Sequence, residues 1–294
     1  MKLIHKVEEC AVYESNKQSY ASMSSSSLPQ VKTFLIKITS SNTPEVAPAL
    51  LSTLGKSVKH AHVYNHTSTS IKIKALKAIP LKTFIEDMHS LSPSPSSPSS
   101  SSSNMAGMAY TLTLKLLADV GTQLERIRVE HGLIIPFLSL EDIVVIETQT
   151  IRDHKEDESD NQEEEIGDSK SESSESEPEY TFIFMNAEKL AQEPAEPNKK
   201  ELIIDVPLKV NKHTSFLPVE LPESAIKRLP MRLTTTSWQY SLSALCIYAL
   251  LQHKFKNGED DIERIGRPFL HTSLYFCLKR CLKPDPEERV LLYV

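Results

Sequence analysis

Glycine is scarce in this chain, which has 7 glycines in 294 residues. The average usage of about 7% would give roughly 20. None falls in the first 54 residues, and no two lie within seven positions of each other. A loop that wraps the phosphates of a nucleotide needs clustered glycines, because its backbone must approach the phosphates closely and often at positive φ. The sequence therefore excludes a Walker-type P-loop and a Rossmann G-x-G-x-x-G loop.

Paired cysteines and long apolar runs are also missing. The four cysteines, Cys10, Cys246, Cys277 and Cys281, form no C-x-x-C motif. Cys277 and Cys281 lie four residues apart in an apolar helical stretch, a spacing that favours buried free thiols over a disulfide. Because the chain shows no signal peptide and no apolar run of about 18 residues, we expect an intracellular protein, cytoplasmic or nuclear, that binds no membrane.

Positive charge is too sparse for a dedicated nucleic-acid binder. The formal net charge of the chain is −6, but residues 151–180 hold 13 acidic and 3 basic residues, a local net charge of −10. The rest of the chain therefore carries about +4, without the clustered Lys and Arg that nucleic-acid binding requires. We expect a protein partner and no nucleic acid.

Two low-complexity tracts interrupt the chain, a Ser/Pro tract at about 90–105 and an acidic, Ser-rich tract at about 152–179. Neither has enough apolar side chains to offset the entropy of ordering, so both are predicted to be disordered loops. In the acidic tract, Ser169, Ser174 and Ser176 each have a Glu three residues downstream, the spacing that acidophilic kinases favour. The tract is either a solvated spacer or a phosphorylated interaction loop.

The remaining blocks alternate or repeat with the periods of strands and helices. In residues 31–38, for example, Phe34, Ile36 and Ile38 lie on one side of a predicted strand, and Leu35 and Lys37 on the other. We expect strands at 31–38, 58–64, 70–75, 133–140, 143–147 and 181–185, and helices at 44–54, 81–91, 110–131, 237–253 and 270–282. This order predicts an α+β fold with a strand-rich start and a helical end.

Several blocks resemble the motifs of a eukaryotic protein kinase domain, in the same order. Residues 274–289 (LYFCLKRCLKPDPEER) are similar to the kinase helix that ends in an Arg, and residues 216–221 (FLPVEL) to the A-P-E stretch. Residues 31–38 (VKTFLIKI) resemble the V-A-I-K strand, with Lys37 in the Lys position, and 240–251 (YSLSALCIYALL) resemble the buried helix between them. The resemblance implies a two-lobed fold, with a small N-lobe at 1–80 and a helical C-lobe at 81–294. It also implies that Glu220 and Arg289 pair and hold the C-lobe together.

Apart from Lys37, the residues that kinase chemistry requires do not stand at the corresponding positions. Phosphoryl transfer of this type needs a Gly-rich loop, a Lys–Glu pair, an Asp base, and an Asn and an Asp for Mg²⁺. The resemblance instead places Leu51 at the Glu position, Ile135, Pro136 and Phe137 at His-Arg-Asp, Asp142 at the Asn position, and Met185, Asn186 and Ala187 near Asp-Phe-Gly. We therefore expect no catalytic residue, no metal ligand and weak or absent ATP binding, with Lys37 as a vestige of the cofactor site.

The sequence thus predicts a pseudokinase, a catalytically inactive kinase-like protein that acts as an interaction or scaffold module. One alternative is a divergent, active serine/threonine kinase that uses Lys37 and Asp142 with an unrecognised base. Another is an unrelated protein whose acidic loop binds basic partners. Simpler interpretations also stay open for single residues: Lys37 as an exposed strand lysine, Asp142 as a turn residue, and Glu220 and Arg289 as ordinary surface charges.

Overall fold

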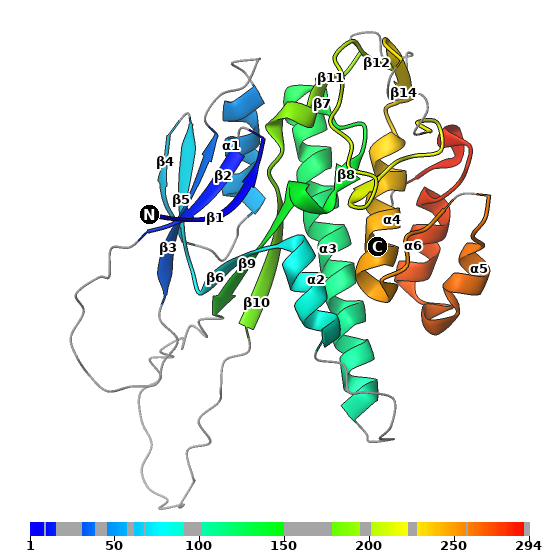
Figure 1. Cartoon of the computed structure of the whole chain (residues 1–294), viewed down its shortest axis with the longest axis horizontal. Helices are drawn as coiled ribbons and strands as arrows, with labels where there is room; N and C mark the ends of the chain where they lie inside the picture. Colours follow the sequence, from blue (N-terminus) through cyan, green and yellow to red (C-terminus); the bar gives the residue numbers. More distant parts are fainter. Residues whose placement is uncertain are drawn as a thin grey trace, which may run out of the picture.

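A five-stranded antiparallel sheet forms the N-terminal part of the protein, as seen in a computed structural model (Figure 1). The structure describes residues 1–8, 10–15, 31–38, 46–57, 62–67, 69–90, 101–149, 178–194, 201–222, 228–256 and 258–290. In sheet order, the strands are β1 (Lys2–Val7), β2 (Cys10–Glu14), β3 (Lys32–Ile38), β5 (Ser70–Ala75) and β4 (His62–His66).

One face of this sheet packs on helix α1 (Val46–Ser57). Ile36 lies opposite Ile71 in the register of β3 and β5, and both are buried. A methyl group added at Gly55 of α1 would lie 3.8 Å from Cδ1 of Ile71, so this face is the one that meets the helix. Since side chains alternate along a strand, Lys37 lies on the opposite face and is exposed.

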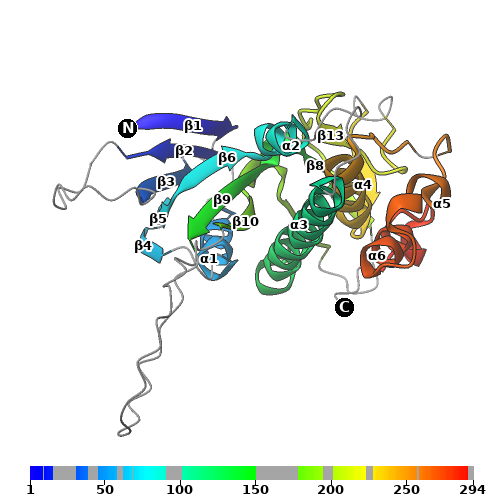
Figure 2. The ribbon, with the colours of Figure 1, turned by 90° about the horizontal axis from the view of Figure 1, so that it is seen from below.

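A second, three-stranded sheet and a long helix lie between the first sheet and the C-terminal helices (Figure 2). Its strands, in order, are β10 (Pro178–Phe184), β9 (Ile143–Gln149) and β6 (Lys77–Pro80), and the helices beside it are α2 (Leu81–Ser90) and α3 (Ser101–His131). His5 of β1 reaches across to the 3₁₀ turn that precedes β9, where its Nε2 lies 2.7 Å from the carbonyl oxygen of Glu141. The N-terminal sheet is thereby fastened to the rest of the molecule.

Two side chains of α3 complete the edge of strand β10. Gln123 donates from Nε2 to the carbonyl oxygen of Phe184 at 2.9 Å and accepts from the Phe184 amide at 2.9 Å. Asp119, one helical turn earlier, accepts from the amide of Phe182 at 3.0 Å. Burial outweighs these contacts and raises the pKa of Asp119. The helix thus supplies, at Phe182 and Phe184, hydrogen bonds that a fourth strand would make to this edge of β10.

The C-terminal part is built around helix α4 (Ser237–Leu251), which is buried on nearly every side because its residues are apolar all round. Helix α6 (Ser273–Cys281) packs on it with one apolar stripe, and α5 (Ile262–Ile265) lies at the outer side. Short strands link the segments around α4: β7 (Leu133–Ile134) with β11 (Ala191–Gln192), β8 (Leu138–Ser139) with β13 (Ser215–Phe216), and β12 (Glu201–Ile204) with β14 (Met231–Thr234).

The predicted α+β fold is confirmed, since the strand-rich start, the long helix and the helical end occur in the expected order. Most of the predicted loop at about 90–105 lies outside the described residues, which leave out 91–100. On either side of this gap, α2 extends to Ser90, and α3 begins at Ser101 and not at the expected residue 110. Residues 152–177 of the acidic tract, which include Ser169, Ser174 and Ser176, lie outside the described residues. The last two residues of the tract, 178 and 179, belong to β10. Strands β1 and β2 were not predicted.

Within the described ranges, no helix combines the length and the apolar character needed to cross a membrane.

The clamp between α3 and β10 predicts a large loss of stability in Gln123→Leu. This change leaves the buried amide and carbonyl of Phe184 without partners, so the free energy of unfolding should fall by about 2–4 kcal/mol. The neighbouring Thr122 is exposed, and Thr122→Ala should stay within about 0.5 kcal/mol of the native value. Urea denaturation of both variants measures the difference. Equal midpoints for the two would contradict the clamp.

Candidate functional site

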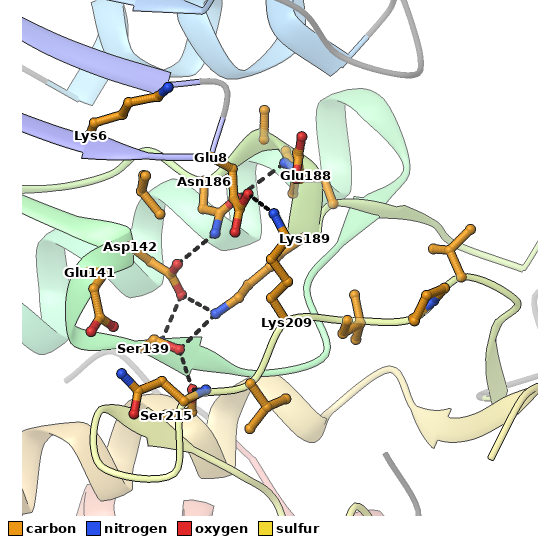
Figure 3. Close-up of a pocket in the computed structure, with 18 residues that line it drawn as sticks. Lys6, Glu8, Ser139, Glu141, Asp142, Asn186, Glu188, Lys189, Lys209 and Ser215 are labelled. Carbon is orange, nitrogen blue, oxygen red and sulfur yellow. Dashed lines mark hydrogen bonds and ion pairs between the residues drawn. The ribbon is translucent and has the colours of Figure 1, made fainter. Parts of the chain in front are cut away.

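An open cavity of about 780 Å³ lies where the two parts of the protein meet (Figure 3). Its walls are the tip of the β1–β2 hairpin, the 3₁₀ turns Leu140–Asp142 and Ala187–Lys189, and the extended segment 206–211. The cavity thus lies at the position where the kinase resemblance implies a catalytic cleft.

A buried lysine occupies the centre of the polar wall of this cavity. The ammonium group of Lys189 donates to Oδ2 of Asp142 at 2.6 Å and to Oγ of Ser139 at 2.8 Å. It also lies 4.2 Å from the centre of the Phe137 ring, a distance typical of a cation–π contact. The Lys189 side chain is 8% exposed and that of Asp142 is 1% exposed, so this is a buried ion pair with both charges matched.

Local turns hold each partner of Lys189 in place. Asp142 closes the first 3₁₀ turn and accepts the amide of Ser139 at Oδ2, 2.7 Å away. Asn186 caps the second turn by accepting the amide of Glu188 at Oδ1, and donates from Nδ2 to Oδ1 of Asp142 at 2.7 Å. The Ser139 hydroxyl lies 2.7 Å from that of Ser215. Both oxygens of the Asp142 carboxylate are therefore already hydrogen-bonded.

The described residues do not fit a divalent cation at this point. A hard cation such as Mg²⁺ needs open carboxylate or carbonyl oxygens. Asp142 is the carboxylate at the expected position, and an ammonium group already lies within 2.6 Å of it. In the described part of the chain, no group of three or more His, Cys, Asp or Glu is arranged to hold a metal ion.

The kinase resemblance aligns the catalytic base with Phe137. This side chain is fully buried and stands in the sequence between strands β7 and β8, outside the residues that line the cavity. Next to it, the amide of Leu138 donates to Oγ of Ser241 at 2.6 Å, and the Ser241 hydroxyl donates to the carbonyl oxygen of Phe216. The backbone at this point is thereby fixed to α4 and β13.

The hairpin over the cavity is short and acidic. β1 ends at Val7 and β2 begins at Cys10, and Glu8 takes a φ of 46° at the tip. Glu8 forms an ion pair with Lys209 of the opposite wall, with 2.5 Å between Oε2 and Nζ. The cavity is lined by three lysines (Lys6, Lys189, Lys209) and four carboxylates (Glu8, Glu141, Asp142, Glu188), so its lining has no excess positive charge for a triphosphate.

Glu220 and Arg289 are brought together on the far side of α4. Nη1 and Nη2 of Arg289 donate to Oε1 and Oε2 of Glu220 at 2.7 and 2.8 Å, a bidentate pair. The guanidinium group is fully buried; it also donates to the carbonyl oxygens of Lys283 and Pro284 and lies 5.0 Å from the centre of the Tyr240 ring. Ser237 at the start of α4 donates to Glu220 at 2.7 Å. Three segments therefore meet at this ion pair.

Lys37 does not reach the cavity. It lies on the sheet face opposite α1 and is absent from the cavity lining, whereas its neighbours Ile36 and Ile38 point toward the helix. Leu51 of α1, at the expected Glu position, is fully buried. Lys37 thus stands apart from this cavity, and its assignment as a vestige of the cofactor site stays a prediction.

Sequence reasoning missed Lys189 and the two serines that complete the network. Lys189 bonds to a residue 47 positions earlier in the chain, and no local pattern of the sequence indicates that contact. Of this network, the sequence indicated only Asp142 and Asn186. The kinase resemblance places Asp142 at the Asn position and Asn186 near the Asp-Phe-Gly position.

Among solved structures, the chain is similar to the PknI kinase domain of Mycobacterium tuberculosis, which was crystallised as a point mutant. The identity is 12%, the match covers 98% of this chain and 88% of that chain, and the TM-score is 0.41. No protein-family model matches the chain, and neither does any curated protein sequence. An identity of 12% and a TM-score of 0.41 carry no information about the residues that line the cavity.

The bidentate pair predicts that Arg289→Met strongly destabilises the protein. The change leaves the carboxylate of Glu220 partly buried without its counter-charge, which costs about 3–5 kcal/mol. Arg232→Met is the matched control, because its ion pair with Glu201 joins side chains that are 69% and 42% exposed and contributes about 1 kcal/mol or less. Calorimetric melting of both variants checks the difference. A loss in Arg289→Met no larger than in Arg232→Met would contradict the anchoring role.

The same pair predicts a loss of stability in acid. Burial alone would raise the pKa of Glu220, but the hydrogen bonds from Arg289 and Ser237 outweigh it and hold the pKa below its usual value of 4.5. Stability from this lowered pKa is present above pH 4.5 and is lost as the pH falls through the folded-state pKa. In Glu220→Gln this component is absent, so its unfolding free energy should fall less steeply below about pH 4.5 than that of the native chain. Parallel slopes in urea titrations at about pH 3–6 would contradict this account.

Proposed function

We propose that this chain is a catalytically inactive, kinase-like protein that acts as a protein-interaction or scaffold module. The observation that carries the proposal is the ammonium group of Lys189, which is bonded to the one carboxylate that stands at a metal-ligand position of the kinase resemblance. The kinase-like fold supports the interpretation, because the scaffold is retained while the chemical groups are replaced.

The replacement affects each chemical step of phosphoryl transfer. Phosphoryl transfer requires a metal ion that neutralises the charge of the phosphates. To bind Asp142, such an ion would have to displace the ammonium group of Lys189 and break a buried ion pair. A base must accept the proton of the substrate hydroxyl, and the side chain at that position is Phe137. The other carboxylates of the cavity lining, Glu8, Glu141 and Glu188, do not stand at the positions that the resemblance assigns to the base and the metal ligands.

ATP binding is proposed to be weak or absent for a separate, electrostatic reason. The hairpin that would cover the phosphates has only two residues between its strands and presents Glu8, which pairs with Lys209 across the cavity. Like charges near a triphosphate disfavour its binding, and the ion pair would have to break to admit it. The Glu8–Lys209 ion pair thus already bridges two walls of the open cavity.

A divergent active kinase is the alternative within the same fold. It would have to use Asp142 and Lys37, and the geometry favours neither. Both carboxylate oxygens of Asp142 already accept hydrogen bonds, and Lys37 lies on the sheet face opposite α1. The other alternative, an acidic loop that binds basic partners, depends on the net charge of −10 at residues 151–180.

The proposal predicts no response of the native chain to Mg-ATP or Mn-ATP in a thermal-shift assay, and no phosphotransfer to itself or to a generic substrate. In Lys189→Ser the Asp142 carboxylate loses its ammonium partner and keeps its bonds to Ser139 and Asn186, so Oδ2 can contact Mn²⁺, which should raise the Tm of this variant. The double variant Lys189→Ser/Asp142→Asn, which lacks the carboxylate, should show no such rise. Metal-dependent stabilisation and turnover by the native chain would refute the proposal and support the active kinase.

Deletion of residues 153–177 separates the acidic-loop alternative from the interaction module. If binding of a basic probe such as poly-lysine is the main activity, the deletion should abolish it while the Tm is unchanged. If fluorescence anisotropy finds the same affinity with and without these residues, the acidic-loop interpretation is wrong.

A further inference from the structure

Three of the four cysteines gather where helices α4 and α6 pack together. Cys277 and Cys281 stand one turn apart on α6, and Cys246 lies on α4. Cys246 and Cys281 are buried, Cys277 is partly exposed, and none of the three is in a disulfide. Cys277 is therefore the member of the group that a small reagent in solvent can reach.

The helix places Cys277 and Cys281 at a separation compatible with a disulfide after a local adjustment. Residues four apart on an α-helix have Cα atoms about 6 Å apart, within the range of about 4.4–6.8 Å seen for disulfides. Their Cβ atoms point the same way, so closing the bond requires the last turn to unwind. Because α6 ends at Cys281, no further helical turn follows, and the last turn can unwind without disrupting the rest of the helix.

The two thiols differ in reactivity. A hydrogen bond with Cys281 lowers the pKa of Cys277, and the positive charge of Arg280 acts in the same direction. The same hydrogen bond, together with burial, raises the pKa of Cys281. The lowered pKa favours the thiolate, the nucleophilic form of cysteine, on the partly exposed Cys277, and the raised pKa favours the protonated form of its neighbour Cys281.

Cys281 also holds the chain segment that carries Arg289. When its single S–H is not directed at Cys277, Cys281 donates it to the carbonyl oxygen of Val290, 3.6 Å away. Val290 directly follows Arg289, whose side chain is fully buried against Glu220. A change at Cys281 therefore acts next to the ion pair that joins the C-terminal segments.

We propose that Cys277 and Cys281 form a peroxide-reactive dithiol, in which Cys277 is the attacking residue and Cys281 the resolving one, and that its oxidation releases the segment at Arg289 and Val290. This inference is independent of the proposed function, since it concerns neither the cavity nor a partner.

The reaction balances with hydrogen peroxide as the only co-reactant. The Cys277 thiolate attacks one oxygen of peroxide and breaks the O–O bond, which yields Cys277 sulfenic acid and hydroxide, protonated to water. The sulfur of Cys281 then attacks the sulfur of Cys277, forming the S–S bond and expelling hydroxide, which takes the Cys281 proton and leaves as a second water. Two thiols are oxidised, and one peroxide is reduced to two waters.

The structural consequence follows from the loss of the Cys281 proton. In the disulfide, Cys281 has no S–H to donate, so the contact with the Val290 carbonyl is lost. The last turn of α6 also shifts to bring the sulfurs together. The segment at Arg289 and Val290 should then leave its packed position more often, and this exposes the peptide bond after Arg289 to trypsin. In the reduced protein, the burial of the Arg289 side chain protects this bond.

The test treats the full chain with hydrogen peroxide, maps the thiols by alkylation and mass spectrometry, and follows tryptic release of residues 290–294. We expect a Cys277–Cys281 disulfide that dithiothreitol reverses, and release of 290–294 about tenfold faster than from the reduced protein, since proteolysis follows the population of the open form. Cys10→Ser, at a cysteine buried in the N-terminal sheet, is the matched control and should behave like the native chain.

Two conservative variants separate the roles of the two thiols. Cys281→Ser keeps a donor for Val290, and its Cys277 should accumulate as a sulfenic acid that dimedone traps, with no faster release of 290–294. Cys277→Ser should form no disulfide with Cys281. A disulfide from Cys277 to Cys246, oxidation of Cys277 directly to a sulfinic acid without a disulfide, or equal tryptic release in the oxidised and reduced proteins would overturn the proposal.

Discussion

The ion pair between Lys189 and Asp142 organises the cavity on which the functional account depends. Its two members come from different 3₁₀ turns, and Ser139, Asn186 and the Phe137 ring complete the shell around them. A buried charge without a partner is costly, so each member requires the other. The positive charge that a kinase-like cleft would obtain from a metal ion is here a covalent part of the chain, and this is why we propose a scaffold and not a catalyst.

The C-terminal part depends on a second charged contact of the same kind. Arg289 reaches Glu220 across 69 residues and is buried against Tyr240, and its neighbour Val290 is held by Cys281. The two ion pairs share no residue and have different roles: the first fixes the cavity, and the second fastens the end of the described chain to α4. The proposed dithiol acts on the second alone, so its chemistry and the inactivity of the cavity can be tested separately.

The sequence predicted most of the fold because its long elements carry strong periodic patterns. Helices α3 and α4 and strand β5 follow from apolar spacing, although α3 begins earlier than its apolar residues indicate, since its first turns are serine-rich. The cavity was less accessible. Lys37 was placed by motif likeness, yet the alternation of Phe34, Ile36 and Ile38 already indicated that it faces away from α1. Lys189 could not be found, because its partner lies far away in the sequence and only folding brings them together.

The most direct test is a crystal structure of the native chain grown with Mg²⁺ and a non-hydrolysable ATP analogue. Our account predicts that Nζ of Lys189 stays within hydrogen-bond distance of Oδ2 of Asp142, with Glu8 still paired to Lys209 and no cation bound to the carboxylate. A structure with Lys189 withdrawn and a divalent cation bridging Asp142 and the phosphates would contradict it.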